Sequence, residues 1–351
     1  MGGDVKWTVS ALKYWGLSCW QHFFYCWPAY AFTSDLDRSV PNEYPGIIIV
    51  GPTASGKSRL GISLAVRFRG EIISCDALQL YRGMDIGTAK VSASDRELVP
   101  HHMLDILNPN EDFSAGAYQR EARKSLEEIC KRGNVPFVVG GTGFYLQAFL
   151  NGLFDGPAKE ETLRVRMRKI IKRRGTKTLH RALERIDPQS ASRIEEADGE
   201  RIMRAYEIYL ASGRPMSWWR QQPRNALQGC YWLKMGIHIP RTELYERIDN
   251  RVDEMFQDGF LEEVQSLLAL YPRSSPAFKA IGYRQIVDYA DGKQSMERAI
   301  ADIKMESRRY AKRQMTWFRR DPDIQWIEDR GEAPKLDTAA VALVEKFLSL
   351  K

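Results

Sequence analysis

The sequence lacks the cysteine patterns that mark metal sites and disulfide frameworks. It has five cysteines, and none of them stands in a C-x-x-C pair. Cysteines scattered in this way predict free thiols in a reducing compartment and argue against a zinc site. Internal repeats and low-complexity segments are also absent from the chain. The cysteines are Cys19, Cys26, Cys75, Cys130 and Cys230.

Long uninterrupted hydrophobic runs are missing as well, even from the aromatic N-terminal segment. Four tryptophans occur in the first 27 residues, but Gln21, His22 and Pro28 interrupt the apolar stretch around them. These interruptions disfavour both a signal peptide and a membrane span. We therefore expect an extension outside the folded core, no membrane partner and a cytoplasmic location.

The composition is that of an ordinary globular protein. Of the 351 residues, 44% are hydrophobic and 28% are charged, and the length suffices for one elaborated domain or two smaller ones. Lys and Arg number 52 against 45 Asp and Glu, which gives a formal net charge of +7. This charge favours an anionic partner, although a solvated basic surface would give the same balance.

A glycine-rich stretch directly after an apolar run carries the strongest functional signal. The run Gly46–Val50 is typical of a buried strand, and residues 51–58 then match the pattern G-x-x-x-x-G-K-S/T. Backbone N–H groups of such a turn bind phosphate oxygens, Lys57 adds a cation, and Ser58 offers a hydroxyl to Mg²⁺. Residues 59–68 are predicted to form the helix that follows. The predicted phosphate-binding residues are Gly51, Pro52, Thr53, Ala54, Ser55, Gly56, Lys57 and Ser58.

Two further apolar runs predict strands whose ends lie near this phosphate cradle. Residues 71–76 end on a carboxylate, Asp76, and residues 135–139 run into Gly140-Gly141-Thr142. The carboxyl ends of parallel strands form the ligand-binding edge of an open α/β sheet, so we expect Asp76 and Thr142 there. In phosphate-loop ATPases a strand like the second one ends in an Asp that helps to hold Mg²⁺. Its replacement by glycines argues against hydrolysis.

The middle of the chain is basic and has helical periodicity. Seven Lys and Arg side chains occur between residues 164 and 174, with apolar residues at helical spacing. This pattern fits either a solvated helix face or a surface that contacts a phosphate backbone. Helices are also predicted at 114–131, 178–185, 187–195, 200–211 and 241–256, and a strand at 231–239.

The predicted fold is α/β, with a P-loop NTPase-like parallel sheet core and a mostly helical insertion domain. We expect an extension at 1–44, the first part of the core at 45–154, a basic helical insertion at 155–222, the second part of the core with C-terminal helices at 223–331, and a tail or helix at 332–351.

Three other groups of residues allow a structural and a functional interpretation. Arg247 and Arg251 lie four residues apart on the predicted helix 241–256, where they could clamp an anion or join a surface ion-pair network. Residues 305–320 mix basic and aromatic side chains, which suits nucleic acid or core packing. The pair His101 and His102 does not have metal-ligand spacing, so we expect a structural role.

Several of these motifs together resemble one enzyme family. They are residues 51–58, Asp76 with 79–90, residues 139–145, the two arginines and residues 282–285, all in the expected order. In combination they resemble bacterial tRNA dimethylallyltransferases, also called tRNA isopentenyltransferases, from about Pro45 to about Trp326.

The resemblance implies a reaction and its components. A dimethylallyl group would pass from dimethylallyl diphosphate to N6 of the adenosine 3′ of the anticodon in tRNA, in a monomer that uses Mg²⁺. The catalytic residues implied are Asp76 as general base, Thr53, Thr142 and Arg251, with Arg247 as a further diphosphate ligand and Ser58 as the metal ligand. The implied tRNA contacts are Asp76, Ala77, Leu78, Gln79, Thr142, Arg164, Glu200, Arg201, Ile202, Met203, Arg204, Lys279, Ala280, Ile281, Gly282, Tyr283 and Arg284. Family members commonly have Ser where this chain has Ala77.

Three alternatives remain open at this point. An adenylate isopentenyltransferase would carry out the same chemistry on free AMP, ADP or ATP, but the long basic insertion favours a polynucleotide. A P-loop kinase or ATPase would use the cradle for ATP, and the glycine-terminated strand argues against it. An RNA-binding module with a vestigial cradle would not need the intact Lys57-Ser58 pair.

Overall fold

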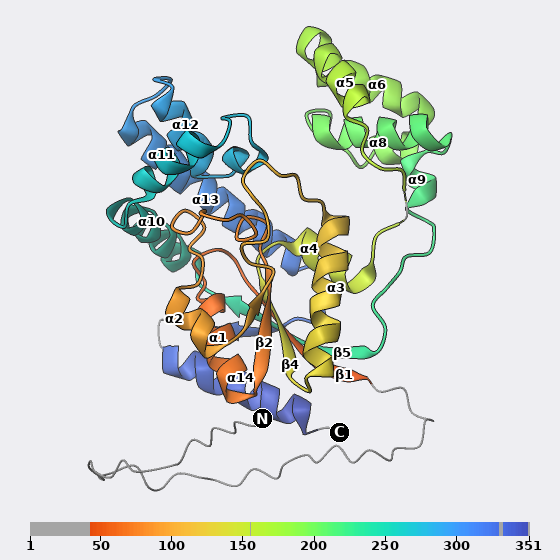
Figure 1. Ribbon diagram of the computed structural model, residues 1–351. Helices are drawn as coiled ribbons and strands as arrows, with labels where there is room; N and C mark the ends of the chain where they lie inside the picture. Colours follow the sequence, from red (N-terminus) through yellow and green to blue (C-terminus); the bar gives the residue numbers. More distant parts are fainter. Residues whose placement is uncertain (1–42, 155, 330–332, 350–351) are drawn as a thin grey trace, which may run out of the picture. The chain divides into compact units, whose positions relative to one another are not determined.

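A computed structural model describes residues 43–154, 156–329 and 333–349 (Figure 1). The chain divides into a unit at 1–41 and a unit at 42–351. The predicted extension at 1–44 lies almost wholly outside the described residues. Among the helices described, none has the length and hydropathy needed to span a membrane.

A six-stranded parallel sheet forms the centre of the fold and confirms the predicted α/β class. Its strand order is β3-β2-β4-β1-β5-β6, and every neighbouring pair is parallel. The register places Ile48 of β1 between Val138 of β4 and Lys234 of β5. The strands are β1 (Tyr44–Val50), β2 (Gly70–Cys75), β3 (His101–His102), β4 (Val135–Gly140), β5 (Cys230–His238) and β6 (Gln325–Glu328).

Helices cover both faces of the sheet because alternate residues of each strand point to opposite sides. Ile47 and Ile49 of β1 join the apolar cluster that contains α1 (Lys57–Arg67), α14 (Ala333–Leu348) and the start of α10. Ile48 and Val50 join the opposite cluster, which contains α3 (Ala115–Lys131) and α4 (Gly143–Asn151). The sheet is therefore the middle of three layers, as Figure 1 shows.

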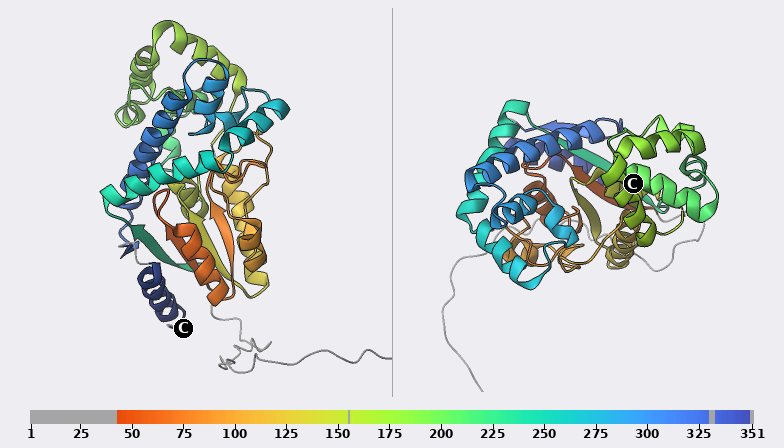
Figure 2. Two further views of the ribbon diagram at one scale, coloured as in Figure 1. Left: turned by 90° about the vertical axis from the view of Figure 1, so that its left-hand side faces the viewer. Right: turned by 90° about the horizontal axis from the view of Figure 1, so that it is seen from above.

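Four helices after β5 form a third apolar cluster beyond the carboxyl ends of the strands. It is built around Phe260, Tyr283 and Ile303, and it includes Tyr81 and Met84 from the loop that follows β2. Figure 2 shows these helices from two further directions. They are α10 (Arg241–Gln257), α11 (Phe260–Leu270), α12 (Tyr283–Ala290) and α13 (Met296–Phe318), with the 3₁₀ helix η1 (Pro276–Lys279) between α11 and α12. The short α2 (Ala93–Leu98) stands between β2 and β3.

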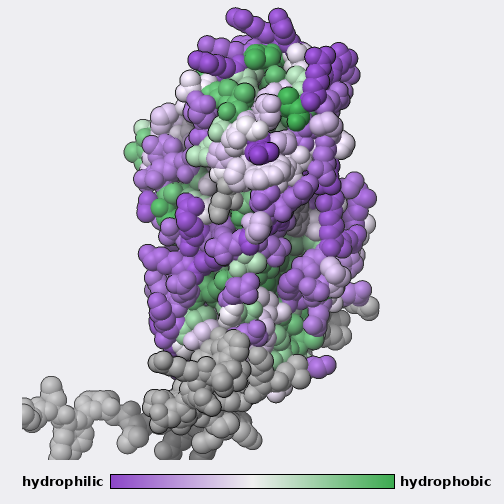
Figure 3. Space-filling model, turned by 90° about the vertical axis from the view of Figure 1, so that its right-hand side faces the viewer, coloured by the Kyte–Doolittle hydropathy of each residue, from purple (hydrophilic) through white to green (hydrophobic). Residues whose placement is uncertain are grey.

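The segment between α4 and β5 is helical and has its own core. Its apolar cluster is centred on Leu183, Ile202 and Ile208, which are fully buried. Figure 3 shows a face of the molecule on which hydrophilic residues predominate and apolar residues gather in separate patches. The helices are α5 (Glu161–Arg174), α6 (Thr176–Ile186), α7 (Pro188–Ala191), α8 (Gly199–Ser212) and α9 (Met216–Trp219).

A buried carboxylate at the start of β2 explains the histidine pair. Glu71 is 2% exposed and accepts hydrogen bonds from Arg132 (2.8 Å) and Asn134 (2.7 Å), and it bonds with His102 Nε2 at 2.7 Å. His101 Nδ1 lies 2.7 Å from the carbonyl oxygen of Val99. Both imidazoles therefore serve the fold, as predicted.

Replacing the buried carboxylate is expected to destabilise the protein in a pH-dependent way. Burial alone would raise the pKa of Glu71, but the hydrogen bonds from Arg132, Asn134 and His102 lower it from 4.5 to about 2. The ionised form therefore stabilises the fold above pH 4.5, and this contribution is lost as the pH falls toward 2. Urea unfolding at pH 7 should show that Glu71→Gln loses about 2 kcal/mol, because a buried amide leaves donors unpaired.

The exposed Glu127 of α3 supplies the control for this experiment. Glu127→Gln should leave the free energy of unfolding unchanged. The difference in free energy of unfolding between wild type and Glu71→Gln should narrow below pH 4.5, where the Glu71 carboxyl of the unfolded wild-type chain takes up a proton that the folded protein still excludes. A gap that stays constant down to pH 3 would show that ionisation of Glu71 does not stabilise the fold.

Candidate active site

The predicted phosphate cradle joins β1 to α1, as the motif requires. Lys57 is the first residue of α1, and its Nζ donates to the carbonyl oxygen of Pro52 at 3.2 Å. The hydroxyl of Ser55 is buried and, within the part of the chain that the structure describes, has no hydrogen-bond partner. The cradle thus brings a cation and the N-terminus of a helix to one loop, which is the arrangement that binds phosphate.

The electrostatics of Lys57 fit an anion site. Burial, together with the charge of Arg251, lowers the pKa of Lys57 to about 8, although Asp76 acts in the opposite direction. A bound polyanion would reverse this shift, because an opposite charge favours the protonated amine. Without a ligand, the negative charge of Asp76 therefore does not balance the positive charges of Lys57 and Arg251.

Arg251 reaches the cradle from α10. Its Nη1 donates to Thr53 Oγ1 at 2.8 Å, and its Nη2 donates to the carbonyl oxygen of Thr88 at 3.4 Å. Its Nε is buried and has no partner among the described residues. The neighbouring Arg247 instead donates hydrogen bonds to the carboxylates of Asp329 (2.8 Å) and Glu243 (2.5 Å). Of the two arginines, the structure therefore places Arg251 at the cradle and Arg247 in an ion-pair network.

The opposite wall of the site comes from the ends of β2 and β4. Asp76 follows β2, and its Oδ1 accepts from the backbone N–H of Leu78 at 2.9 Å. Thr142 follows β4, and its hydroxyl accepts from the backbone N–H of Ala77 at 3.1 Å. The two predicted catalytic side chains are thus fixed by the same short turn. Tyr310 of α13 lies beside them: burial and the charge of Asp76 raise its pKa to about 12, while a hydrogen bond with Thr142 opposes the shift.

Steric constraints explain why glycines occupy the two positions at the end of β4. A Cβ at Gly140 would lie 2.1 Å from the carbonyl oxygen of Cys75, and one at Gly141 would lie 2.1 Å from Nε2 of Gln314. No side chain fits at either position without displacing a neighbour, so an ATPase-type carboxylate has no place here. The closely approaching Gln314 was not predicted from the sequence.

Gln314 links the two sides of the site through its side-chain amide. Its Oε1 accepts from the backbone N–H of Thr53 at 2.9 Å, and its Nε2 donates to the carbonyl oxygen of Gly141 at 2.9 Å. A side-chain amide offers both a donor and an acceptor, and Gln314 uses one of each here. The residue lies in the basic and aromatic segment 305–320, but the charges and rings there gave no signal for it.

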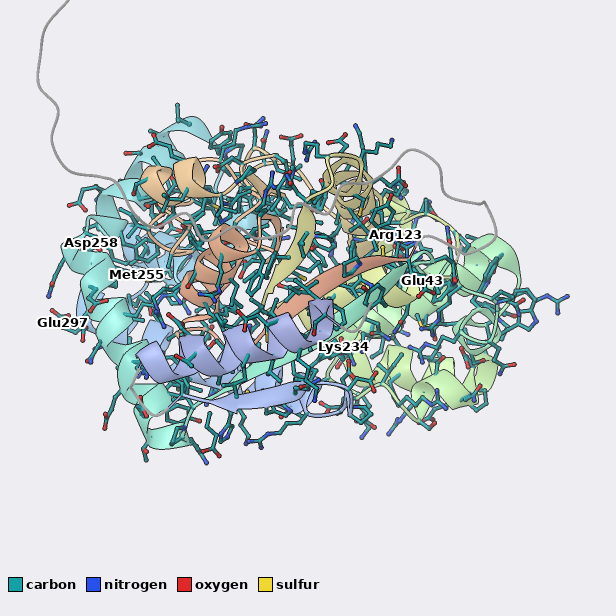
Figure 4. All side chains as sticks on the ribbon, turned by 90° about the horizontal axis from the view of Figure 1, so that it is seen from below. Glu43, Arg123, Lys234, Met255, Asp258 and Glu297 are labelled. Carbon is teal, nitrogen blue, oxygen red and sulfur yellow. The ribbon has the colours of Figure 1, made fainter. Side chains whose placement is uncertain are left out.

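A cleft of about 410 Å³ contains most of these groups. It is lined by Thr53, Lys57 and Ser58 of the cradle, by Asp76 and Arg251, and by Lys279 to Gly282 before α12. A second cleft of about 710 Å³ shares Arg251, Ala89 and Met255 with the first. Figure 4 labels Met255 and also Asp258, which lines the second cleft. The smaller cleft therefore contains both the predicted anion site and the carboxylate of Asp76.

Comparison with known proteins agrees with this geometry. The IPP transferase family model matches residues 79–321. A tRNA dimethylallyltransferase of Koribacter versatilis is 45% identical over 298 residues, which are 85% of this chain and 97% of that protein. This chain belongs to the IPP transferase family. A family relative named tRNA dimethylallyltransferase, from Carboxydothermus hydrogenoformans, is 44% identical over 288 residues, 82% of this chain and 93% of its own length.

Solved structures of the family have the same fold. The full-length tRNA isopentenylpyrophosphate transferase of Bacillus halodurans aligns with a TM-score of 0.63 and 37% identity, over 88% of this chain and 99% of that one. A eukaryotic dimethylallyltransferase acting on tRNA aligns with a TM-score of 0.73 and 27% identity, over 88% of this chain and 80% of that one. These likenesses support the predicted P-loop NTPase-like core.

The structure buries several side chains of the predicted tRNA-binding set. Ile202 and Met203 are 0% and 2% exposed within the core of the helical segment, and Tyr283 is 0% exposed. Arg164 is also buried, and its guanidinium contacts the carboxylates of Glu207 and Glu200. Packing or ion pairing occupies these side chains in this conformation, and their role in binding tRNA stays a prediction.

The remaining predicted contacts lie at the cleft or on the helical surface. Ala77, Leu78, Gln79, Lys279, Ala280, Ile281 and Gly282 line the cleft with Asp76, and Thr142 accepts from the backbone N–H of Ala77. Glu200, Arg201 and Arg284 are exposed, whereas Arg204 is half-buried and donates to the carbonyl oxygen of Pro157 at 2.7 Å. For these residues the role in binding tRNA stays a prediction.

The pKa of Lys57 generates a test of the cradle. Inorganic pyrophosphate should bind more weakly as the pH rises through about 8, because Lys57 then loses its proton. Titration calorimetry at several pH values between 7 and 9 measures this directly.

Lys57→Met separates the titration of Lys57 from that of the ligand. The variant should bind pyrophosphate weakly, and its pH dependence should contain only the ligand's own ionisation. Identical pH profiles for wild type and variant would contradict a role for the Lys57 charge.

Proposed function

We propose that this protein transfers a dimethylallyl group from dimethylallyl diphosphate to N6 of the adenosine immediately 3′ of the anticodon in tRNA. Membership of the IPP transferase family supports the proposal, as do the names of the relatives. The observation that carries it is the single cleft that holds both a phosphate cradle and Asp76. The phosphate cradle can bind the diphosphate that leaves, and Asp76 can accept the proton from the amine that attacks.

The chemistry follows from these groups. The bond between the allylic carbon and the diphosphate oxygen breaks as the N6 nitrogen forms a bond to that carbon. Lys57, Arg251 and the backbone N–H groups of the cradle stabilise the negative charge that develops on the diphosphate. Asp76 accepts the proton from N6, while Thr53 places Arg251 and Thr142 fixes the turn that carries Asp76.

Mg²⁺ is proposed as the cofactor, with Ser58 as its main protein ligand. Among the described residues, no cluster of three or more His, Cys, Asp or Glu side chains is arranged to hold a metal ion. This fits Mg²⁺, which commonly uses one or two protein oxygens together with substrate phosphates and water. The hydroxyl of Ser58 lines the same cleft as Lys57, so the donor set suits the ion. When bound, Mg²⁺ supplies further charge stabilisation to the diphosphate.

Exposed positive charges on the helical segment support tRNA as the acceptor. Arg166, Arg168, Lys169, Lys172, Arg173 and Arg174 of α5 are all exposed. Such a surface contacts phosphates without reading sequence, and the target base would leave its stack to enter the cleft. A free nucleotide would not need it. We also propose that the protein acts as a monomer in the cytoplasm.

Labelled transfer tests the proposed function. The protein is incubated with labelled dimethylallyl diphosphate, Mg²⁺ and unmodified tRNA, with AMP as the acceptor in a parallel reaction. Nucleoside mass spectrometry should find N6-isopentenyladenosine in the tRNA. Label on AMP alone would identify an adenylate isopentenyltransferase, and release of phosphate from ATP would identify an ATPase.

Asp76→Asn tests the general base. The substitution keeps the shape and the hydrogen bond from Leu78 but removes the proton acceptor, so kcat should fall about a hundredfold or more. Binding of tRNA should stay at the wild-type level. Asp112→Asn, at an exposed carboxylate, serves as the control. A variant at position 76 with near-normal turnover would rule out this role.

A further inference from the structure

Glu263 lies outside the cleft, yet its carboxylate organises one of the walls. It is in the first turn of α11, and its two oxygens accept four hydrogen bonds. Oε2 accepts from the backbone N–H groups of Asp85 (2.8 Å) and Ile86 (2.6 Å). Oε1 accepts from the backbone N–H of Gly87 (3.2 Å) and from the hydroxyl of Tyr283 (2.6 Å). One side chain thus binds three consecutive N–H groups.

The loop held in this way separates the two clefts. Asp85 and Ile86 line the larger cleft, Gly87 and Thr88 line the smaller one, and Ala89 lines both. Consecutive N–H groups that point the same way form a nest that requires an anion. Glu263 supplies that anion from within the protein, so the nest is occupied before any substrate arrives.

The carbonyl side of the same loop holds groups of the active site. The carbonyl oxygen of Thr88 accepts from Nη2 of Arg251 and from Nε2 of Gln79, each at 3.4 Å. Gln79 Nε2 also donates to the carbonyl oxygen of Ala89 at 3.4 Å. The loop therefore holds one nitrogen of the guanidinium whose other nitrogen donates to Thr53 at 2.8 Å.

Packing leaves the loop little freedom beneath these bonds. A Cβ at Gly87 would lie 2.2 Å from Cε2 of Phe260 and 2.6 Å from the hydroxyl oxygen of Tyr283. The loop thus rests on two aromatic rings that pack edge to face, with centroids 5.2 Å apart. Packing on these rings fixes how closely the loop approaches α11 and α12, and Glu263 fixes the orientation of the loop's peptide groups.

We propose that Glu263 is a positioning residue for the diphosphate site. By binding the N–H groups of residues 85–87, it orients the carbonyl oxygen of Thr88, which in turn directs Arg251 toward the cradle. The proposal rests on the proposed function, and it names a residue that acts on the binding of the prenyl diphosphate rather than on that of tRNA.

An amide cannot replace this carboxylate. Each oxygen of Glu263 already accepts from two donors, so a Gln in either orientation turns its NH₂ group toward at least one backbone N–H. The electrostatic effect of Glu263→Gln has the opposite sign, because removing a negative charge near an anion site strengthens anion binding. Weaker pyrophosphate binding by the variant would therefore show that the loop at residues 85–88 and Arg251 are no longer held in place.

Pyrophosphate affinity is the decisive measurement. Calorimetry should show about tenfold weaker binding of inorganic pyrophosphate to Glu263→Gln than to wild type. In the transfer assay the KM for dimethylallyl diphosphate should rise by a similar factor, while the KM for tRNA stays unchanged. Glu262→Gln, which removes the same charge from the exposed neighbour in the same helical turn, should behave as wild type.

The opposite results would overturn the proposal. They are unchanged or tighter pyrophosphate binding in a folded Glu263→Gln variant, or an equal rise in the KM for tRNA. Should that variant not fold, Tyr283→Phe removes one of the four donors and should weaken pyrophosphate binding about threefold. Unchanged binding there would count against the proposal.

Failure of the proposed function gives a different pattern. Calorimetry with pyrophosphate needs neither tRNA nor transfer. If wild type transfers no label but Glu263→Gln still weakens pyrophosphate binding, the proposed function fails and the positioning role stands.

Discussion

The amide of Gln314 is the contact on which the active site depends. It ties the backbone of the cradle loop to the end of β4, two segments that both border the smaller cleft. Nε2 of this amide occupies the space where a Cβ of Gly141 would lie, and the carbonyl oxygen of Cys75 occupies the corresponding space at Gly140. These two contacts together leave no room for an ATPase-type carboxylate at the end of β4 unless a neighbour moves.

The sequence predicted the parts of the fold that have a strong local pattern. The apolar runs of β1, β2, β4 and β5 and the periodicity of α3 and α10 gave elements within a few residues of those observed. β3 and β6 were not predicted, because two and four residues are too few to show a period, and their pairing depends on neighbours far along the chain. The cradle, Asp76 and Arg251 were found from motifs, since their spacing is local.

The sequence could not separate residues that contact a ligand from residues that support those contacts. Tyr283 stands in a motif expected to bind tRNA, yet it is buried against Phe260 and donates to Glu263. Arg164 belongs to a basic run, and only the fold shows that it alone turns inward to Glu207. Gln314 and Thr53 are separated by 261 positions, so no spacing rule connects them. Such roles arise from long-range packing.

The helical segment between α4 and β5 has consequences for how this enzyme can change over evolutionary time. Its apolar residues pack among themselves, with Phe154 and Trp219 in contact where the chain enters and leaves. A unit that carries its own core adds little strain to its host when its surface drifts or its helices lengthen. The contact with nucleic acid that we propose for the exposed cations of α5 can therefore diversify by substitution on this unit, while the residues of the cleft stay unchanged. Selection can then act on the surface of the helical unit and on the chemistry of the cleft as two separate traits.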